Sequence, residues 1–160
     1  TVVISEVQTS GRGRRGREWN SPKGGIYISF ILKPNIPPEK APQLTLVSSL
    51  ALAETLNSMD KKLDAKIKWP NDILIKGKKI SGILTELSSD IEKINHIVVG
   101  VGVNLNTDKN ALPETGTSLK TEMGENVSIK LFLKLFLEHF DLVYKAVSYT
   151  HLTLPTIYSV

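Results

Sequence analysis

The chain has 160 residues, 41% of them hydrophobic and 22% charged, which is enough for one globular domain with a sizeable core. It has no cysteine, which excludes disulfides and thiolate metal sites, and its three scattered histidines suggest no zinc cluster. Four of its 20 basic residues lie in residues 11–17, and the rest of the chain carries 16 basic and 16 acidic residues. The net charge of +4 is therefore concentrated in one loop. This favours a single small anion as the ligand over a nucleic acid, which is usually bound by a broad basic stripe.

The first half of the chain predicts two strands and then a helix. Val2 to Gln8 alternates apolar and polar residues, and Gly25 to Lys33 is rich in β-branched and aromatic residues, so both segments predict strands. Four prolines between positions 34 and 42 predict a loop. Gln43 to Met59 has the apolar spacing of a helix, which we expect to pack on the sheet through Leu44, Val47, Leu50, Ala51 and Leu56.

The second half predicts four strands and another helix. The strands are Lys66–Trp69, Ile73–Lys76, Lys79–Leu87 and Ile94–Val101, with turn residues between the first three. A polar loop follows from about residue 104 to 116. Ser128 is expected to cap a helix that runs to about Ala146, with apolar residues at Leu131, Leu135 and Leu142. The order β-β-α-β-β-β-β-α predicts an α/β or α+β domain on a mixed, mainly antiparallel sheet.

The loop GRGRRGREW, from Gly11 to Trp19, combines residues that are costly to order. Its glycines let the backbone turn closely around a ligand, and arginine binds phosphate oxygens with two parallel hydrogen bonds. Without a ligand the four arginines repel one another, so we expect a mobile loop. The alternative interpretation is a solvated basic loop that binds nothing specific.

KWPND, residues 68–72, ends a strand in a turn. Pro-Asn-Asp forms such turns without any functional role. The functional alternative gives Asp72 a role at Mg²⁺ or as a proton acceptor, and gives Asn71 a contact with a nucleotide.

KKISGILTE and GVGVN, residues 78–86 and 100–104, place glycines on two neighbouring strands. Glycine inside a strand often marks the close approach of a ligand, so Gly82 and the glycines at 100 and 102 predict a mostly apolar slot. In a regular strand, Lys79 and Ser81 share one face and Ile80 and Gly82 the other. Lys79 is then either a ligand-binding cation or an ordinary exposed lysine beside a hairpin turn.

In this order the four motifs resemble the biotin–protein ligases, also called biotin–[acetyl-CoA-carboxylase] ligases, over about Val2 to Ala146. The resemblance implies a class II synthetase-like catalytic domain, a mixed sheet flanked by helices. It implies an enzyme that forms biotinoyl-AMP from biotin and ATP with Mg²⁺. The biotinoyl group would then pass to a lysine of the biotin carboxyl carrier protein, an acetyl-CoA carboxylase subunit.

The resemblance also implies a role for individual residues. Biotin would contact Gln8, Gly11, Arg12, Gly13, Arg14, Lys79, Gly82, Leu84, Gly100 and Gly102. ATP would contact Arg14, Arg17, Asn71, Lys79 and Asn104. Catalysis would fall to Lys79, Asp72 and Arg14, with Asp72 also at Mg²⁺, and Trp19 would anchor the closed loop. Lys79 would touch both the biotin carboxylate and the α-phosphate, where two anions meet.

We expect the catalytic domain to span residues 1–147 and to lack its beginning, because the family's Ser-Thr-Asn motif would lie before Thr1. The tail 148–160 fits neither the family pattern nor a good helix, and the family's small β-barrel is missing after it. No signal peptide or apolar run of ~20 residues occurs, so we expect a cytoplasmic location without membrane contact. A homodimer is left open. The alternatives are a lipoate or octanoate ligase or transferase of the same fold, and a nucleic-acid-binding module that uses the Arg/Gly loop.

Overall fold

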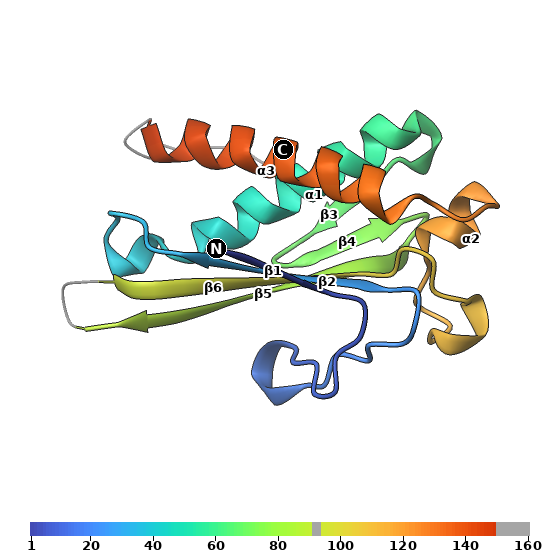
Figure 1. Ribbon diagram of the computed structural model, residues 1–160, viewed down its shortest axis with the longest axis horizontal. Coiled ribbons are helices and arrows are strands. Elements are labelled where there is room, and N and C mark those ends of the chain that lie inside the picture. The colour runs from blue at the N-terminus through green and yellow to red at the C-terminus, as the bar shows by residue number, and fades with distance from the viewer. Residues whose placement is uncertain (91–93, 150–160) are drawn as a thin grey trace.

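One sheet and two long helices make up most of residues 1–90 and 94–149, the part that this computed structural model describes (Figure 1). The strands follow one another across the sheet in the order β1-β2-β6-β5-β4-β3, and each neighbouring pair is antiparallel. Their bounds are β1 Val2–Ser5, β2 Ile26–Leu32, β3 Lys66–Lys68, β4 Asp72–Ile75, β5 Lys78–Ser89 and β6 Ile94–Val103. The helices are α1 Gln43–Met59, α2 Leu119–Met123 and α3 Ile129–Tyr149.

The predicted order of elements is confirmed, and so is the mainly antiparallel α+β class. The strand boundaries differ by more than one residue in three places: β1 stops at Ser5, β5 continues to Ser89, and β6 continues to Val103. The short helix α2 was not predicted. Helix α3 ends at Tyr149, so most of the tail 148–160 lies outside the described residues.

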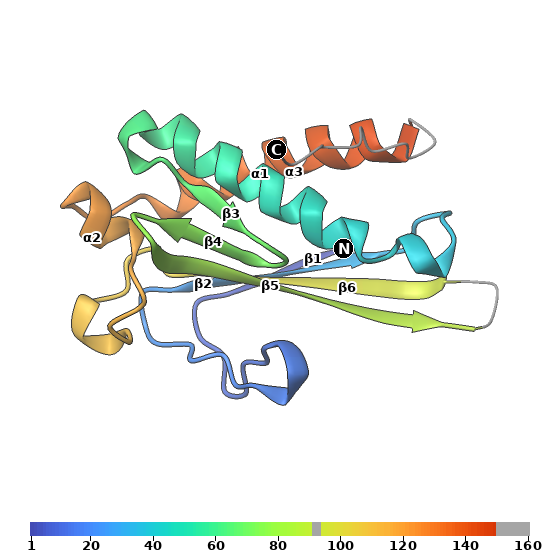
Figure 2. The ribbon, with the colours of Figure 1, turned by 180° about the vertical axis from the view of Figure 1, so that it is seen from behind.

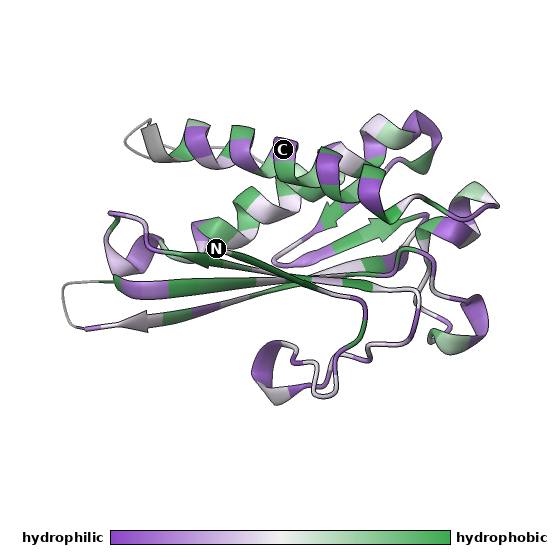
Figure 3. Ribbon diagram, in the orientation of Figure 1, coloured by the Kyte–Doolittle hydropathy of each residue, from purple (hydrophilic) through white to green (hydrophobic). Residues whose placement is uncertain are grey.

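Both long helices cover the same face of the sheet (Figures 1 and 2). The loop with residues 11–17 lies on the opposite face, and Figure 3 shows that it is hydrophilic where β2 and β6 are largely apolar. The core therefore forms between the sheet and the helices, which leaves the other face for a ligand. None of the helices in the described ranges is long and apolar enough to cross a membrane.

The buried face of α3 is not the one that we expected. Leu131 and Leu142 are 49% and 66% exposed, whereas three phenylalanines and Val143 face the core. These buried residues are Phe132, Phe136, Phe140 and Val143. Phe140 stacks on Phe30 of β2 with ring centroids 3.9 Å apart. Because a phenylalanine buries more apolar area than a leucine, the phenylalanine stripe prevails over the leucine stripe.

Helix α1 agrees with the sequence pattern except at one residue. Leu44, Val47, Ala51 and Leu56 are buried as expected. Leu50 is 43% exposed, because it lies on the same face of the helix as the exposed Glu54 four residues later.

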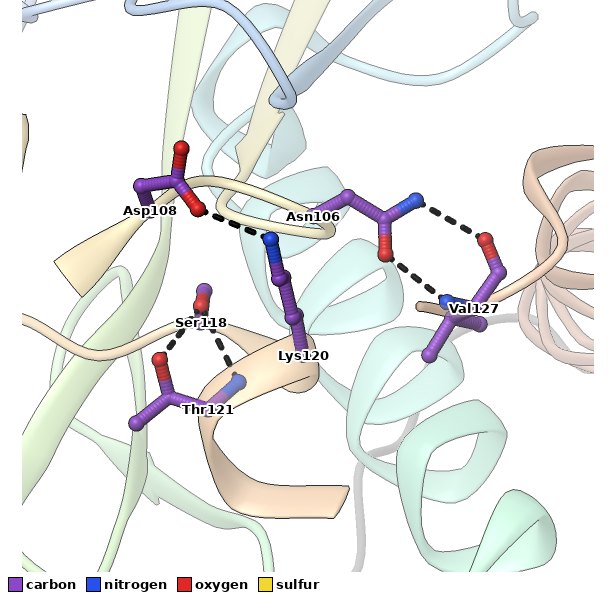
Figure 4. Close-up of polar contacts among 6 residues, drawn as sticks. All are labelled: Asn106, Asp108, Ser118, Lys120, Thr121 and Val127. Atoms are coloured by element: carbon purple, nitrogen blue, oxygen red, sulfur yellow. Dashed lines mark hydrogen bonds and ion pairs between the residues drawn. The ribbon is translucent and has the colours of Figure 1, made fainter. Parts of the chain in front are cut away.

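The segment between β6 and α3 is fastened by side-chain hydrogen bonds (Figure 4). The Asn106 side-chain amide donates a hydrogen bond to the Val127 carbonyl and accepts one from the Val127 N–H, both at 2.8 Å. Ser118 caps α2 by accepting a hydrogen bond from the Thr121 N–H, and Lys120 pairs with Asp108 at 2.8 Å. These bonds order a segment whose residues 104–116 were predicted only as a polar loop.

Candidate functional site

A cavity of about 590 Å³ is lined by residues of the loop 11–17 and by residues of β2, β5 and β6. It brings together motifs that are far apart in the sequence. Thirteen of the predicted site residues line it: Gln8, Arg12, Gly13, Arg14, Arg17, Trp19, Asn71, Asp72, Lys79, Gly82, Leu84, Gly100 and Gly102. The four motifs therefore form one site.

Paired glycines on β5 and β6 form the floor of this cavity. Gly82 lies opposite Gly102 in the antiparallel register. A Cβ atom at Gly82 would lie 2.7 Å from Trp19 Cζ3, and one at Gly102 would lie 2.8 Å from Trp19 Nε1. Gly100 is less crowded, because the nearest atom to its Cβ position is the Leu84 carbonyl oxygen at 3.6 Å. The indole thus rests against the first two glycines.

Trp19 contacts the glycine floor from just beyond the loop of residues 11–17, called the arginine loop below. Its ring centroid is 5.1 Å from Lys79 Nζ, within the range of a cation–π contact. Its Nε1 is buried and has no hydrogen-bond partner, so a donor is available to a ligand. The slot differs from our expectation: its floor is apolar, but the walls carry many polar and charged side chains, among them Glu18 and Glu86.

A bulge in β5 changes the direction of Lys79. Leu74 pairs with Lys79 and Ile73 pairs with Ser81, so Ile80 is an extra residue in β5. Ile80 and Ser81 are therefore both buried. Lys79 Cε lies 3.3 Å from the Cβ position of Gly82, so these two residues share the cavity face. The regular alternation that we expected for this strand is wrong, because a bulge inserts one residue and shifts the pattern.

Lys79 forms an ion pair with Asp72 of β4. Its Nζ is 2.7 Å from Asp72 Oδ1, and their side chains are 35% and 22% exposed. No hydrogen bond of good geometry reaches this oxygen, so the contact is electrostatic in character. The pair places one cation and one carboxylate side by side at the edge of the glycine floor.

The arginine loop is joined to the sheet by two of its guanidinium groups. Arg12 pairs with Glu86 at 2.9 Å, and Arg14 donates to Asn71 Oδ1 at 3.2 Å. Within the loop, the Trp19 N–H donates to the Gly11 carbonyl at 3.0 Å, which closes a hairpin. The arginine loop therefore covers the cavity, with two of its arginines directed toward the sheet.

Asn71 is held beside the cavity by β5. Its Nδ2 donates to the Ile83 carbonyl at 3.0 Å, and its own carbonyl accepts from the Ile83 N–H at 2.9 Å. The amide oxygen of Asn71 is thereby directed to Arg14. KWPND is thus more than a turn, since it carries a side chain that contacts the arginine loop.

Two predicted ligand residues do not line the cavity. Asn104 is buried, and its Nδ2 donates to the Thr117 carbonyl at 3.0 Å, so its side chain ties the chain together where we predicted a nucleotide contact. Gly11 is buried, and a Cβ atom there would lie 2.4 Å from the Trp19 carbonyl oxygen and 2.9 Å from Gln8 Oε1. Gly11 thus allows the loop to close.

Sequence reasoning missed Glu86 and Ser29, which also line the cavity. Glu86 is two residues after Leu84 and four after Gly82, so the strand period of two could have placed it on this face. Ser29 pairs with Gly100 in the register of β2 and β6. Nothing in the sequence alone indicates that pairing.

Comparison with known proteins supplies the family. A profile of the Biotin/lipoate A/B protein ligase family matches residues 1–104. The Bifunctional ligase/repressor BirA of Bacillus subtilis is 41% identical over 132 residues, which are 79% of this chain and 40% of that protein. The Biotin--[acetyl-CoA-carboxylase] ligase of Paracoccus denitrificans is 38% identical over 139 residues, which are 83% of this chain and 58% of that protein.

A solved structure agrees with these relatives. The biotin protein ligase from Aquifex aeolicus in complex with biotin and ATP aligns with a TM-score of 0.79 and 33% identity over 93% of this chain and 62% of that one. The chain thus spans about half the length of the curated relatives that it matches. The family profile covers well over half of its residues, and the chain belongs to the Biotin/lipoate A/B protein ligase family.

Proposed function

We propose that this chain is part of a biotin ligase, which activates biotin with ATP and transfers the biotinoyl group to a lysine of a biotin carboxyl carrier protein. The observation that carries the proposal is the single cavity that joins a glycine floor to Lys79, Arg12 and Arg14. Biotin and ATP are the ligands named for the Aquifex aeolicus structure, which supports this choice of substrates.

In the first step, a carboxylate oxygen of biotin attacks the α-phosphorus of ATP, and the bond to pyrophosphate breaks. Two anions must approach each other, so a cation between them is most valuable at the transition state. A unit charge pair ~4 Å apart near a protein surface contributes about 4 kcal/mol before desolvation. Lys79 is the residue that we assign to this position, with Arg14 and Arg17 beside the phosphates.

Asp72 has three roles in this scheme: it pairs with Lys79, it holds Mg²⁺, and in the second step it accepts a proton. Before substrates bind, it neutralises Lys79 at 2.7 Å, and the incoming anions would then compete for the same ammonium group. Among the described residues, no three His, Cys, Asp or Glu side chains converge on a metal. Mg²⁺ commonly takes one or two carboxylates together with phosphate oxygens, so Asp72 would hold an ion that arrives with ATP and offsets phosphate charge.

In the second step, the amine of the acceptor lysine attacks the acyl carbon of the adenylate. A C–N bond forms, the C–O bond to AMP breaks, and the amine loses a proton, which we assign to Asp72. The arginine loop would hold the adenylate until then, because its Arg12 and Arg14 face the cavity. Arg12 and Arg14 are engaged with Glu86 and Asn71, which argues against the nucleic-acid-binding alternative, in which these arginines would be used on phosphates.

The test is pyrophosphate release with MgATP and one of three acids: biotin, lipoate or octanoate. Of the three acids, we expect only biotin to give pyrophosphate release, followed by labelling of a carrier-protein lysine. Release with lipoate or octanoate but not biotin would move the assignment to the other acids of the family, whose description includes lipoate. A cytoplasmic location and a homodimer stay predictions, and sedimentation with and without ligands tests the homodimer.

A further inference from the structure

Lys79 is held by a segment that belongs to none of the four motifs. Its N–H donates to the Thr115 carbonyl at 2.8 Å, and its carbonyl accepts from the Thr117 N–H at 2.9 Å. Gly116 forms a parallel bridge with Lys79. Because the extra residue Ile80 interrupts the ladder between β5 and β4, the backbone of Lys79 is instead fixed by its hydrogen bonds to residues 115–117.

Glu122 of α2 joins this segment to the turn between β4 and β5. The Thr117 hydroxyl donates to Glu122 Oε1 at 2.6 Å, and Lys76 Nζ is 2.9 Å from Glu122 Oε2. Lys76 and Gly77 form that turn with φ of 49° and 78°. The two groups that Glu122 contacts therefore lie on both sides of Lys79: one in the turn before it, the other in the segment beside it.

The Glu122 side chain is only 9% exposed, whereas the other carboxylates that form ion pairs with lysine or arginine in residues 1–90 and 94–149 are 22% exposed or more. Burial by itself would raise the pKa of Glu122, but the Thr117 hydroxyl and the ammonium groups of Lys76 and Lys78 hold it below its ordinary value. A buried and charged carboxylate that contacts two polar partners is costly to disturb, because removing it leaves those partners unpaired.

We propose that Glu122 is a positioning residue for Lys79. Its carboxylate ties the turn at Lys76 to Thr117, so that the backbone of Lys79 is fixed and its ammonium group stays on the cavity face. The expected effect on rate rests on the proposed function, whereas the expected effect on the place of Lys79 does not.

The kinetic test compares Glu122→Gln with the wild type in biotin-dependent pyrophosphate release. We expect kcat to fall about tenfold, which corresponds to about 1.4 kcal/mol, and KM for ATP to change less than about twofold. Lys120→Gln is the matched control. Lys120 lies on the same short helix as Glu122, and its substitution removes an ion pair with Asp108 (Figure 4). It should leave kcat unchanged.

A double-mutant cycle separates positioning from general destabilisation. If Glu122 acts through Lys79, then adding Glu122→Gln to Lys79→Ala should lower the remaining rate by less than about twofold. A second, full tenfold loss in that background would mean that Glu122 acts elsewhere, and would overturn the proposal.

A spectroscopic test does not depend on activity. Lys79 Nζ is 5.1 Å from the Trp19 ring, so Trp19 emission in a Trp69→Phe background reports on the place of Lys79. Glu122→Gln should shift this emission in the same direction as Lys79→Ala, and Lys120→Gln should not. If no acid supports pyrophosphate release, the proposed function fails, but this comparison still decides the inference.

The proposal is overturned if Glu122→Gln leaves Trp19 emission where Lys120→Gln leaves it. If Glu122→Gln does not fold, Thr117→Val removes the hydrogen bond from the Thr117 hydroxyl to Glu122 and leaves the charge in place. Thr117→Ser, which keeps the hydroxyl, should restore the wild-type emission.

Discussion

Adding one methyl group to β6 at Gly102 tests whether Trp19 is anchored on the glycine floor. The new Cβ atom would lie 2.8 Å from Trp19 Cε2 and Nε1 and 3.1 Å from Cζ2. Optimal contacts between carbon atoms are about 3.5–4.0 Å, so the indole must retreat by roughly 1 Å. Trp19 belongs to a loop and Gly102 to a central strand, and the loop is therefore the part that moves.

The magnitude follows from overpacking, which typically costs about 1–3 kcal/mol. We expect the low end for Gly102→Ala, about 1 kcal/mol, because the loop relieves the strain without moving the sheet. In a Trp69→Phe background, Trp19 emission should shift toward that of an exposed indole, and amide exchange in residues 11–17 should become faster. The midpoint of thermal unfolding should fall by only about 2–4 °C.

Gly100→Ala is the matched control on the same strand and the same face. Its Cβ would lie 3.6 Å from the Leu84 carbonyl oxygen, which is an ordinary contact, so it should leave Trp19 emission unchanged. Equal emission from the two variants would refute the placement of the indole over Gly102.

Four further predictions concern the same site. Lys79→Ala should lower the rate of adenylation strongly and biotin binding less, and Lys79→Arg should not restore the full rate; a rate within about twofold of the wild type would make Lys79 an ordinary hairpin lysine. Arg14→Gly should still form biotinoyl-AMP but release it roughly tenfold to a hundredfold faster, seen as labelling of a bystander protein, because a charge-assisted contact is lost; unchanged labelling would refute this. Amide exchange across residues 11–17 should slow when biotin and ATP bind, since bound phosphate offsets arginine repulsion, and equal exchange would count against a closing loop. The lowered pKa of Glu122 means that its stabilising effect is present above its unfolded pKa and is lost as pH falls through the folded pKa. The difference in unfolding free energy between wild type and Glu122→Gln should therefore shrink below about pH 4.5, and a constant difference would contradict it.

The sequence predicted the elements and the motif positions because both depend on local patterns. The β-branched and aromatic residues of 26–32 and the glycines at 82, 100 and 102 can be recognised without knowing what they contact. That most of these residues would gather at one site could be predicted, because the motif order was sufficient to identify the family. Whether each of them contacts biotin or ATP is still a prediction.

What the sequence did not reveal depends on competition and on distant pairing. Helix α3 has a leucine stripe and a phenylalanine stripe, and only the packing against Phe30 decides between them. The bulge at Ile80 has no marker in KKISGILTE, so regular alternation would place Lys79 and Gly82 on opposite faces, whereas both face the cavity. The contact of residues 115–117 with Lys79 joins positions almost 40 residues apart, which no local pattern encodes.

The place of β2 in the sheet has a consequence for how the chain is made on the ribosome. On one side β2 pairs with β1, but its other neighbour is β6, about 70 residues later. At ~5–20 residues per second, roughly 4–14 s pass between the emergence of the two strands. During that interval the apolar sequence IYISFIL has an open edge, which is the feature that lets strands of different chains aggregate. Nascent chains stalled before residue 94 should therefore be the form of this protein most dependent on chaperones.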